Sequence, residues 1–208
     1  MSEIFNKDSI SWKDYYITVK DRPPRETLLT ALSFFEKESR NSDKLFAIDV
    51  GCGSGTDTGE LLNNGWKVLA IDKEKIAIEL LQNKFNDYFN SGRLITKAKS
   101  FENLNLQTTD FINASYCLPF CHPEHFKNLW DKINKAIKLN GRFAGNFFGE
   151  KDEWSKSDDM TFHPEKKVRE MFENYEIEFF HERDEDGETA DGNKKHWHVF
   201  SVVAKKIM

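Results

Sequence analysis

The chain lacks the features of membrane-spanning, disulfide-built and nucleic-acid-binding proteins. No run approaches the ~18 apolar residues of a membrane span, and Met1–Asp8 is polar where a signal peptide needs an apolar stretch. Three cysteines among 208 residues do not form a disulfide framework. Lys and Arg form no arm or stripe, and the formal net charge of −5 disfavours a nucleic-acid partner on electrostatic grounds. We therefore expect a cytoplasmic protein without membrane contact, monomeric by default.

Apolar runs and amphipathic stretches alternate along the chain, which predicts one α/β domain over residues 1–208. Parallel strands need helical crossovers, so this alternation indicates a parallel sheet with helices on both faces. The predicted strands are Leu45–Val50, Trp66–Ile71, Leu94–Lys97, Phe111–Ala114 and Arg142–Phe148, and the predicted helices are Glu26–Ser39, Thr56–Asn63, Glu74–Phe89 and Pro123–Leu139.

The last part of the chain departs from this alternation. Tyr175–Arg183 and Lys195–Lys205 are strand-like and flank a polar loop, Asp184–Asn193, without helical spacing. Two strands joined without a helix must be antiparallel. We therefore predict a seven-stranded, mostly parallel sheet whose last strand is antiparallel.

The N-terminal region, residues 1–40, is an aromatic arm followed by a helix, and residues 41–208 form the predicted core. Phe5, Trp12, Tyr15 and Tyr16 precede the segment Arg22–Arg25. Tyr16 and Arg25 can fold over a bound ligand as a lid, with the arginine pairing a carboxylate. Packing of the arm on the flank of the sheet explains the same residues equally well.

A glycine loop, Gly51–Gly55, follows the first predicted strand and precedes a helix. Such glycines allow a tight turn and a close approach of backbone amides to a ligand. Asp49 precedes the loop, and Asp72 ends the next strand at the position that accepts hydrogen bonds from a ribose diol. Thr56 replaces the third glycine of the dinucleotide pattern. The site should therefore hold an adenosine ligand that carries an ammonium or sulfonium charge rather than a pyrophosphate.

Asp49–Gly55, followed by Leu69–Asp72, resembles motifs I and II of the class I S-adenosylmethionine (SAM)-dependent methyltransferases. Leu139–Phe143 resembles the turn before the fifth strand in that family, and the terminal hairpin is similar to its reversed last strand. Within the class, the chain looks most like the small tellurite-resistance-type and thiopurine-type enzymes. The resemblance implies a Rossmann-like fold, SAM as cofactor and methyl transfer as the reaction.

The same resemblance implies a set of cofactor-binding residues. It places the methionine part of SAM at the glycine loop, the ribose at Asp72 and the adenine near Phe101, where many relatives carry an aspartate instead. The implied set is Asp49, Gly51, Cys52, Gly53, Gly55, Asp72, Lys73, Ser100, Phe101, Asn113 and Ser115, with Tyr16 and Arg25 from the lid.

The methyl acceptor should lie outside the carboxyl ends of the fourth and fifth strands, because ligands of open α/β sheets bind there. Asn113–Tyr116 lacks both prolines of the Asn/Asp-Pro-Pro-Tyr/Phe motif of methyltransferases that act on base or glutamine amines. This departure disfavours a nucleobase amine. We expect a small-molecule acceptor in an aromatic pocket formed by Tyr116, Phe120, Phe148 and Trp154.

Histidines and cysteines near these segments have both functional and structural interpretations. His163 and His196 are candidate general bases or acceptor-orienting residues, and hydrogen-bonded structural histidines are the alternative. His196 and His198 share one face of a predicted strand, but we predict no metal site. Cys117 and Cys121 fit small buried residues better than a soft-ligand site.

Two other functions stay open at this point. A methyltransferase acting on RNA or protein is weakened by the acidic balance of the chain and by the lack of an appended recognition domain. An NAD(P)-dependent dehydrogenase or another nucleotide-binding module uses the same strand-loop-helix unit. Thr56, which replaces the third glycine of the dinucleotide pattern, disfavours this function.

Overall fold

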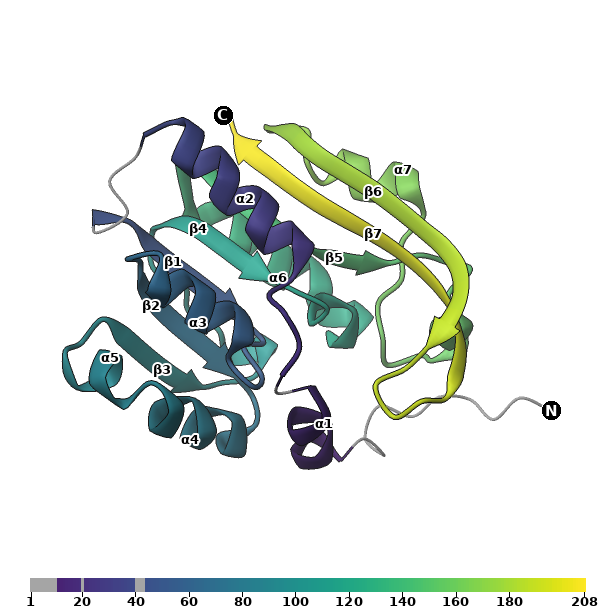
Figure 1. Cartoon of the computed structure of the whole chain (residues 1–208). Coiled ribbons are helices and arrows are strands. Elements are labelled where there is room, and N and C mark those ends of the chain that lie inside the picture. The colour runs from purple at the N-terminus through teal and green to yellow at the C-terminus, as the bar shows by residue number, and fades with distance from the viewer. Residues whose placement is uncertain (1–10, 20, 40–43) are drawn as a thin grey trace.

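A computed structural model describes residues 11–19, 21–39 and 44–208 of the chain (Figure 1). Phe5 and the polar stretch Met1–Asp8 lie outside the described residues. Seven strands form one sheet in the order β3-β2-β1-β4-β5-β7-β6. Their bounds are β1 Phe46–Val50, β2 Lys67–Asp72, β3 Leu94–Ala98, β4 Thr109–Ala114, β5 Ile137–Phe148, β6 Tyr175–Glu188 and β7 Lys194–Lys206.

The sheet has the predicted Rossmann-like topology. The pairs β1–β2, β2–β3, β1–β4 and β4–β5 are parallel, whereas β7 is antiparallel to both β5 and β6. The strand order reverses between β1 and β4, and ligands of such sheets bind at the carboxyl ends of the strands beside that reversal. The fold prediction is therefore confirmed, and it locates the candidate site.

Helices cover both faces of the sheet (Figure 1). Apolar side chains from α2, α3 and α4 pack on one face, and those from α6 and α7 pack on the other. The helices are α1 Trp12–Val19, α2 Glu26–Lys37, α3 Thr56–Asn63, α4 Lys75–Lys84, α5 Asn86–Asn90, α6 Pro123–Ala136 and α7 Glu165–Glu170, with short 3-10 turns η3 Phe101–Asn103, η4 Leu118–Phe120 and η5 Glu153–Lys156. Within the described ranges, no helix is long and apolar enough to cross a membrane.

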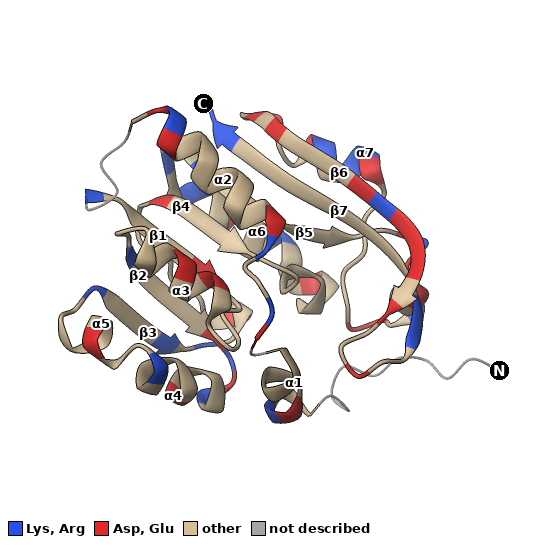
Figure 2. Cartoon of the chain, in the orientation of Figure 1, with Lys and Arg blue, Asp and Glu red and all other residues tan. Residues whose placement is uncertain are grey.

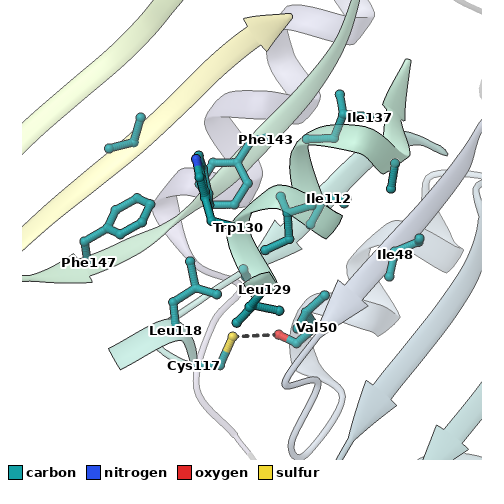
Figure 3. Packing of buried hydrophobic residues seen from close by; sticks show 14 of the residues in the cluster. Ile48, Val50, Ile112, Cys117, Leu118, Leu129, Trp130, Ile137, Phe143 and Phe147 are labelled. Carbon is teal, nitrogen blue, oxygen red and sulfur yellow. Dashed lines mark hydrogen bonds between the residues drawn. The ribbon is translucent and has the colours of Figure 1, made fainter. Parts of the chain in front are cut away.

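Helix α6 shows how the sequence pattern builds the core. Phe126, Leu129, Trp130 and Ile133 recur at the spacing of one helical face, and all four are buried. Trp130 meets the ring of Phe143 on β5 edge-to-face at 5.2 Å between centroids (Figure 3).

Both loop cysteines are buried in this part of the fold, as expected for small core residues. The Cys117 thiol donates a hydrogen bond to the carbonyl of Val50 at 3.0 Å (Figure 3). Cys121 belongs to the same apolar cluster.

Three segments differ from the sequence-based expectation. Strand β6 continues to Glu188, so the predicted loop Asp184–Asn193 shrinks to a short tip; main-chain pairing with β7 holds its acidic residues in the strand. Helix α6 ends at Ala136, because β5 starts at Ile137 and pairs with Thr109. The predicted helix Glu74–Phe89 is divided at Phe85 into α4 and α5.

Arg142 on β5 connects three elements through a buried ion-pair network. Its guanidinium donates to both oxygens of Glu38 after α2, at 2.6 and 3.0 Å, and to both oxygens of Glu178 on β6, at 2.7 and 2.8 Å. Lys205 of β7 also donates to Glu38, at 2.8 Å. Arg142 and the Lys205 ammonium hold the pKa of Glu38 down at about 2. Bidentate pairs of this kind fix the relative orientation of the guanidinium and carboxylate groups in addition to stabilising their charges.

The Arg142→Met substitution should lower the free energy of unfolding by about 3 kcal/mol, since removing one partner of a buried pair leaves the other charge uncompensated. Urea denaturation measures this change. The control is Lys127→Ala, which breaks an exposed pair with Asp131 and should cost less than about 1 kcal/mol. Equal losses in the two variants would contradict the role assigned to Arg142.

Candidate active site

One cleft of about 1240 Å³ opens at the carboxyl ends of β1, β2 and β4. It exceeds the roughly 300–1,000 Å³ of a typical single-ligand pocket, so a cofactor and a second molecule fit together. Fifteen of the predicted site residues line this cleft: Tyr16, Arg25, Asp49, Gly51, Cys52, Gly53, Asp72, Lys73, Ser100, Phe101, Ser115, Tyr116, Phe120, Phe148 and Trp154.

The glycine loop between β1 and α3 needs its glycines. Gly51, Gly53 and Gly55 have φ angles of 69°, 48° and 77°, in the left-handed region of the backbone that residues with a Cβ rarely adopt. A Cβ at Gly51 would overlap the Cys117 side chain, and one at Gly55 would overlap Leu81. Gly55 itself lies at the start of α3 rather than in the cleft lining, so it shapes the loop from behind.

Asp72, at the end of β2, is oriented by the glycine loop and by α1. One carboxylate oxygen accepts a hydrogen bond from the Gly53 N–H at 2.9 Å, and the other accepts from the Glu74 N–H at 2.9 Å and the Tyr16 hydroxyl at 3.3 Å. Burial raises the pKa of Asp72. An ionised carboxylate offers roughly four acceptor positions, so a ligand hydroxyl can still bind here.

Tyr16 makes α1 part of the site. Its ring lies 3.3 Å from where a Cβ on Gly53 would stand, and its side chain is buried. Burial and the Asp72 carboxylate raise the pKa of Tyr16 well above its usual range, so its hydroxyl stays protonated and donates. The sequence analysis did not predict helix α1, although Ser11 and Asp14 at its start have the spacing of a capping box. The Ser11 hydroxyl donates a hydrogen bond to the Asp14 carboxylate at 2.6 Å.

Asp49 lies beneath the glycine loop in a cluster of buried polar groups. It accepts hydrogen bonds from the Thr58 hydroxyl at 2.5 Å and the Asn113 amide at 2.9 Å, and that amide also donates to Asp57 at 3.0 Å. Burial, followed by the charge of Asp57, raises the pKa of Asp49. Asn113 is buried behind Asp49 and does not line the cleft, so it positions the carboxylates.

Arg25 and Tyr116 also line the cleft and contact each other. The Arg25 guanidinium carbon lies 4.6 Å from the centroid of the Tyr116 ring, and the Arg25 N–H donates to Asp57 at 3.0 Å. Tyr116 has φ of 53°, unusual for a residue with a side chain, and its N–H donates to the Asn146 side chain at 3.2 Å. Backbone strain of this kind concentrates at functional sites. Asn146, on the buried strand β5, was not predicted as a site residue.

The other end of the cleft is an aromatic recess, formed by Trp12, Phe120, Phe148, Trp154 and Trp197. Centroid distances are 5.3 Å for Trp12–Phe120, 6.2 Å for Phe148–Trp154 and 5.7 Å for Trp154–Trp197. Rings at these separations form a continuous apolar wall. The sequence reading did not include Trp12 or Trp197 in the pocket.

A buried ion pair supports the recess. The Lys195 ammonium lies 2.5 and 2.6 Å from the two carboxylate oxygens of Asp152, and both side chains are almost fully buried. Burial lowers the pKa of Lys195, and the Asp152 carboxylate opposes that shift. Asp152 also accepts the N–H of Trp154 at 3.0 Å, so it connects β7 to η5. Neither residue was expected from the sequence.

The structure does not bring His163 or His196 to the cleft. The His163 ring packs 4.6 Å from that of Phe126 and lines a separate cavity beside α6 and α7. Its Nε2 is buried and has no hydrogen-bond partner in the described part of the chain, and burial lowers the pKa of His163 to about 4. His196 lies between Asp186 and Asp184, at 2.7 and 2.9 Å. Among residues 11–19, 21–39 and 44–208, no histidine lines the cleft.

Glu182, Asp184 and His198 gather on β6 and β7 with their ligand atoms within 4.8 Å of one another. His198 Nδ1 accepts the Lys151 N–H at 3.1 Å, so Nε2 carries the ring proton and donates to Glu182 at 2.8 Å. That tautomer leaves no nitrogen lone pair for a metal. Figure 2 shows this end of β6 as the most continuous acidic stretch of the ribbon, with Lys and Arg mixed among Asp and Glu elsewhere.

A known sequence family matches the part of the chain that contains the glycine loop. The sequence model of a family described as a methyltransferase domain matches residues 47–141, which contain the glycine loop, Asp72 and Asn113. Residues 47–141 are therefore a methyltransferase domain by sequence. SAM is therefore the cofactor of this enzyme, and the dehydrogenase alternative is set aside. No curated protein matches the chain in sequence.

Solved structures share the fold of this methyltransferase at low sequence identity. TehB from Haemophilus influenzae has a TM-score of 0.69 and 16% identity over 85% of this chain, which spans 61% of TehB. The 1,6-didemethyltoxoflavin-N1-methyltransferase from Burkholderia thailandensis, bound to S-adenosylhomocysteine (SAH), has a TM-score of 0.66 and 17% identity, covering 95% of this chain and 84% of its own. NodS from Bradyrhizobium japonicum has a TM-score of 0.68 and 14% identity, covering 94% and 97%.

The low pKa of His163 predicts a pH-dependent contribution to stability. A histidine with a pKa of about 4 in the folded protein and 6.5 when unfolded stabilises the fold fully above pH 6.5 and less as the pH falls toward 4. The free energy of unfolding of the wild type relative to His163→Gln should therefore fall by about 2 kcal/mol between roughly pH 7 and pH 5. Urea denaturation at the two pH values measures this difference. A pH-independent difference would show that the imidazole is not held neutral.

Proposed function

We propose that this methyltransferase acts on a small-molecule acceptor held in the aromatic recess. The observation that carries the proposal is the continuity of one cleft, which has buried carboxylates and backbone amides at one end and a cluster of aromatic rings in edge-to-face and tilted contact at the other. Two proteins of similar fold are named for small-molecule acceptors, 1,6-didemethyltoxoflavin and magnesium protoporphyrin IX, which supports this class of acceptor.

The residues at the first end fit SAM in shape and in charge. Gly51 and Gly53 leave a cradle that a Cβ at either position would narrow, and the cluster around Asp49 favours a ligand with positive charge nearby. Asp72 can accept a ribose hydroxyl. We propose that Cys52, Lys73, Ser100, Phe101, Ser115, Tyr16 and Arg25 complete the cofactor contacts, with Gly55 and Asn113 supporting them from behind.

When bound, SAM supplies an electrophilic methyl group on a sulfonium, which is already a good leaving group. The task of the chain is to align the acceptor with that methyl group and to exclude water. Tyr116, Phe120, Phe148 and Trp154 are the proposed acceptor contacts. His163 and His196 are not part of this proposal, because neither lines the cleft.

The Asp72→Asn substitution should weaken SAH binding by about tenfold to a hundredfold, because hydrogen bonds to a charged group contribute roughly 1.5–3 kcal/mol each. Isothermal titration calorimetry gives the dissociation constants. Asp131→Asn on the exposed face of α6 is the matched control and should bind SAH as the wild type does. Wild-type affinity in Asp72→Asn would show that Asp72 does not contact the cofactor.

Incubation with methyl-labelled SAM and a fractionated cell extract tests the acceptor class. The label should appear in the low-molecular-mass fraction, because the aromatic rings of the recess suit a small apolar molecule. Mass spectrometry of the labelled product then identifies the acceptor. Label confined to the protein or RNA fractions would contradict the proposal and favour a macromolecular substrate.

A further inference from the structure

The aromatic recess contains a lysine of the chain itself. The ammonium nitrogen of Lys195 lies 3.7 Å from the ring centroid of Trp197, 4.3 Å from that of Trp154 and 5.1 Å from that of Phe148. All three distances fall within the range of roughly 6 Å over which a cation is attracted to an aromatic face. Three rings around one ammonium group form an aromatic cage.

The orientation of the ion pair decides which charge faces the cleft. Lys195 lines the cleft, whereas its partner Asp152 does not and is completely buried. Lys195 also donates to the carbonyl of His196 at 3.4 Å. The positive end of the pair therefore faces the recess, and Asp152 prevents the ammonium from leaving the cage.

Open aromatic cages bind quaternary and methylated ammonium ligands. In this protein the cage is filled from within, so an external ammonium group would have to displace Lys195 and leave the buried Asp152 without its partner. Trp154 and Trp197 nevertheless keep part of their surface exposed to the cleft. That surface suits an uncharged flat ring, which gains stacking without opposing the lysine.

We propose that Lys195 is a specificity-determining residue: it occupies the cage of Phe148, Trp154 and Trp197, so that the recess accepts an uncharged flat aromatic molecule and rejects a cationic one. This inference rests on the proposed function, because it concerns the acceptor end of the same cleft.

Acidic groups at the rim of the recess do not offset this preference. The Glu153 carboxylate accepts the His196 N–H at 3.0 Å, and Glu188 lies opposite Lys194 across the two strands. Asp191 accepts hydrogen bonds within the hairpin tip, from Thr189 and Asn193. These carboxylates are solvent-exposed and screened, unlike the buried Lys195.

A matched pair of probes tests the proposal: quinoline, which is uncharged at neutral pH, and N-methylquinolinium, which has nearly the same shape and a permanent positive charge. Titration into the SAH-saturated protein, followed by the indole N–H signals of its five tryptophans in NMR spectra, gives both dissociation constants. Quinoline should bind at least about tenfold more tightly than N-methylquinolinium, because juxtaposed like charges disfavour the cation. Equal binding, or tighter binding of the cation, would overturn the proposal.

The double variant Lys195→Met/Asp152→Asn removes the charge from the cage without leaving a lone buried carboxylate. It should lose the preference for quinoline and bind N-methylquinolinium at least about tenfold more tightly than the wild type. Lys194→Met is the matched control, since Lys194 is the neighbouring residue, is exposed and lines the same cleft. It should keep the wild-type preference, and an equal change in both variants would show a general effect of rim charge instead.

SAH binding separates the two proposals. A protein that binds SAH but neither probe overturns the inference about Lys195 and leaves the proposed function standing. A wild-type protein that does not bind SAH contradicts the proposed function itself. If the double variant does not fold, the comparison of the two probes on the wild type still decides the question.

Discussion

The amide group of Asn113 lies between two buried carboxylates, and the cofactor end of the cleft depends on that contact. Its nitrogen donates to Asp49 at 2.9 Å and to Asp57 at 3.0 Å, while Asp57 accepts the backbone N–H of Arg25 at 3.0 Å. These hydrogen bonds join β4, β1, the first turn of α3 and the segment before α2. The Asn113 side chain thus joins β4 directly to β1 and α3, and Asp57 extends the connection to the segment before α2.

This arrangement also brings two buried carboxylates close together at the edge of the cleft. Asp49 has Thr58 and Asn113 as donors, but no cation among the contacts found for its side chain in the described residues. Burial opposes ionisation of Asp49, and a positively charged ligand above the glycine loop favours it. Perturbed carboxylates of this kind are common at functional sites, and the proposed position of the cofactor would compensate the charge of this cluster.

The sequence was sufficient for the sheet and for the glycine loop that lines the cleft, because both depend on local signals. Apolar runs identified each strand, and the spacing of Gly51–Gly55 and Asp72 placed the binding loop at its end. The acceptor end depends on which distant side chains meet, and local patterns do not encode that. A lysine between polar neighbours, such as Lys195, looks exposed in a sequence, and only the tertiary contact with Asp152 explains its burial. His163 follows β5 closely in the chain, yet it turns toward α6 and away from the cleft.

The family match ends at residue 141, and residues that line the cleft lie on both sides of this boundary. The glycine loop, Asp72 and Asn113 lie before it, whereas Phe148, Asp152, Trp154, Lys195 and Trp197 lie after it. The residues that fill the recess pack mainly on one another, through the contacts of η5 and the start of β7. Substitutions at Trp154 or Trp197 can therefore reshape the recess without touching the hydrogen bonds that hold Asp49, Asp57 and Asn113 together.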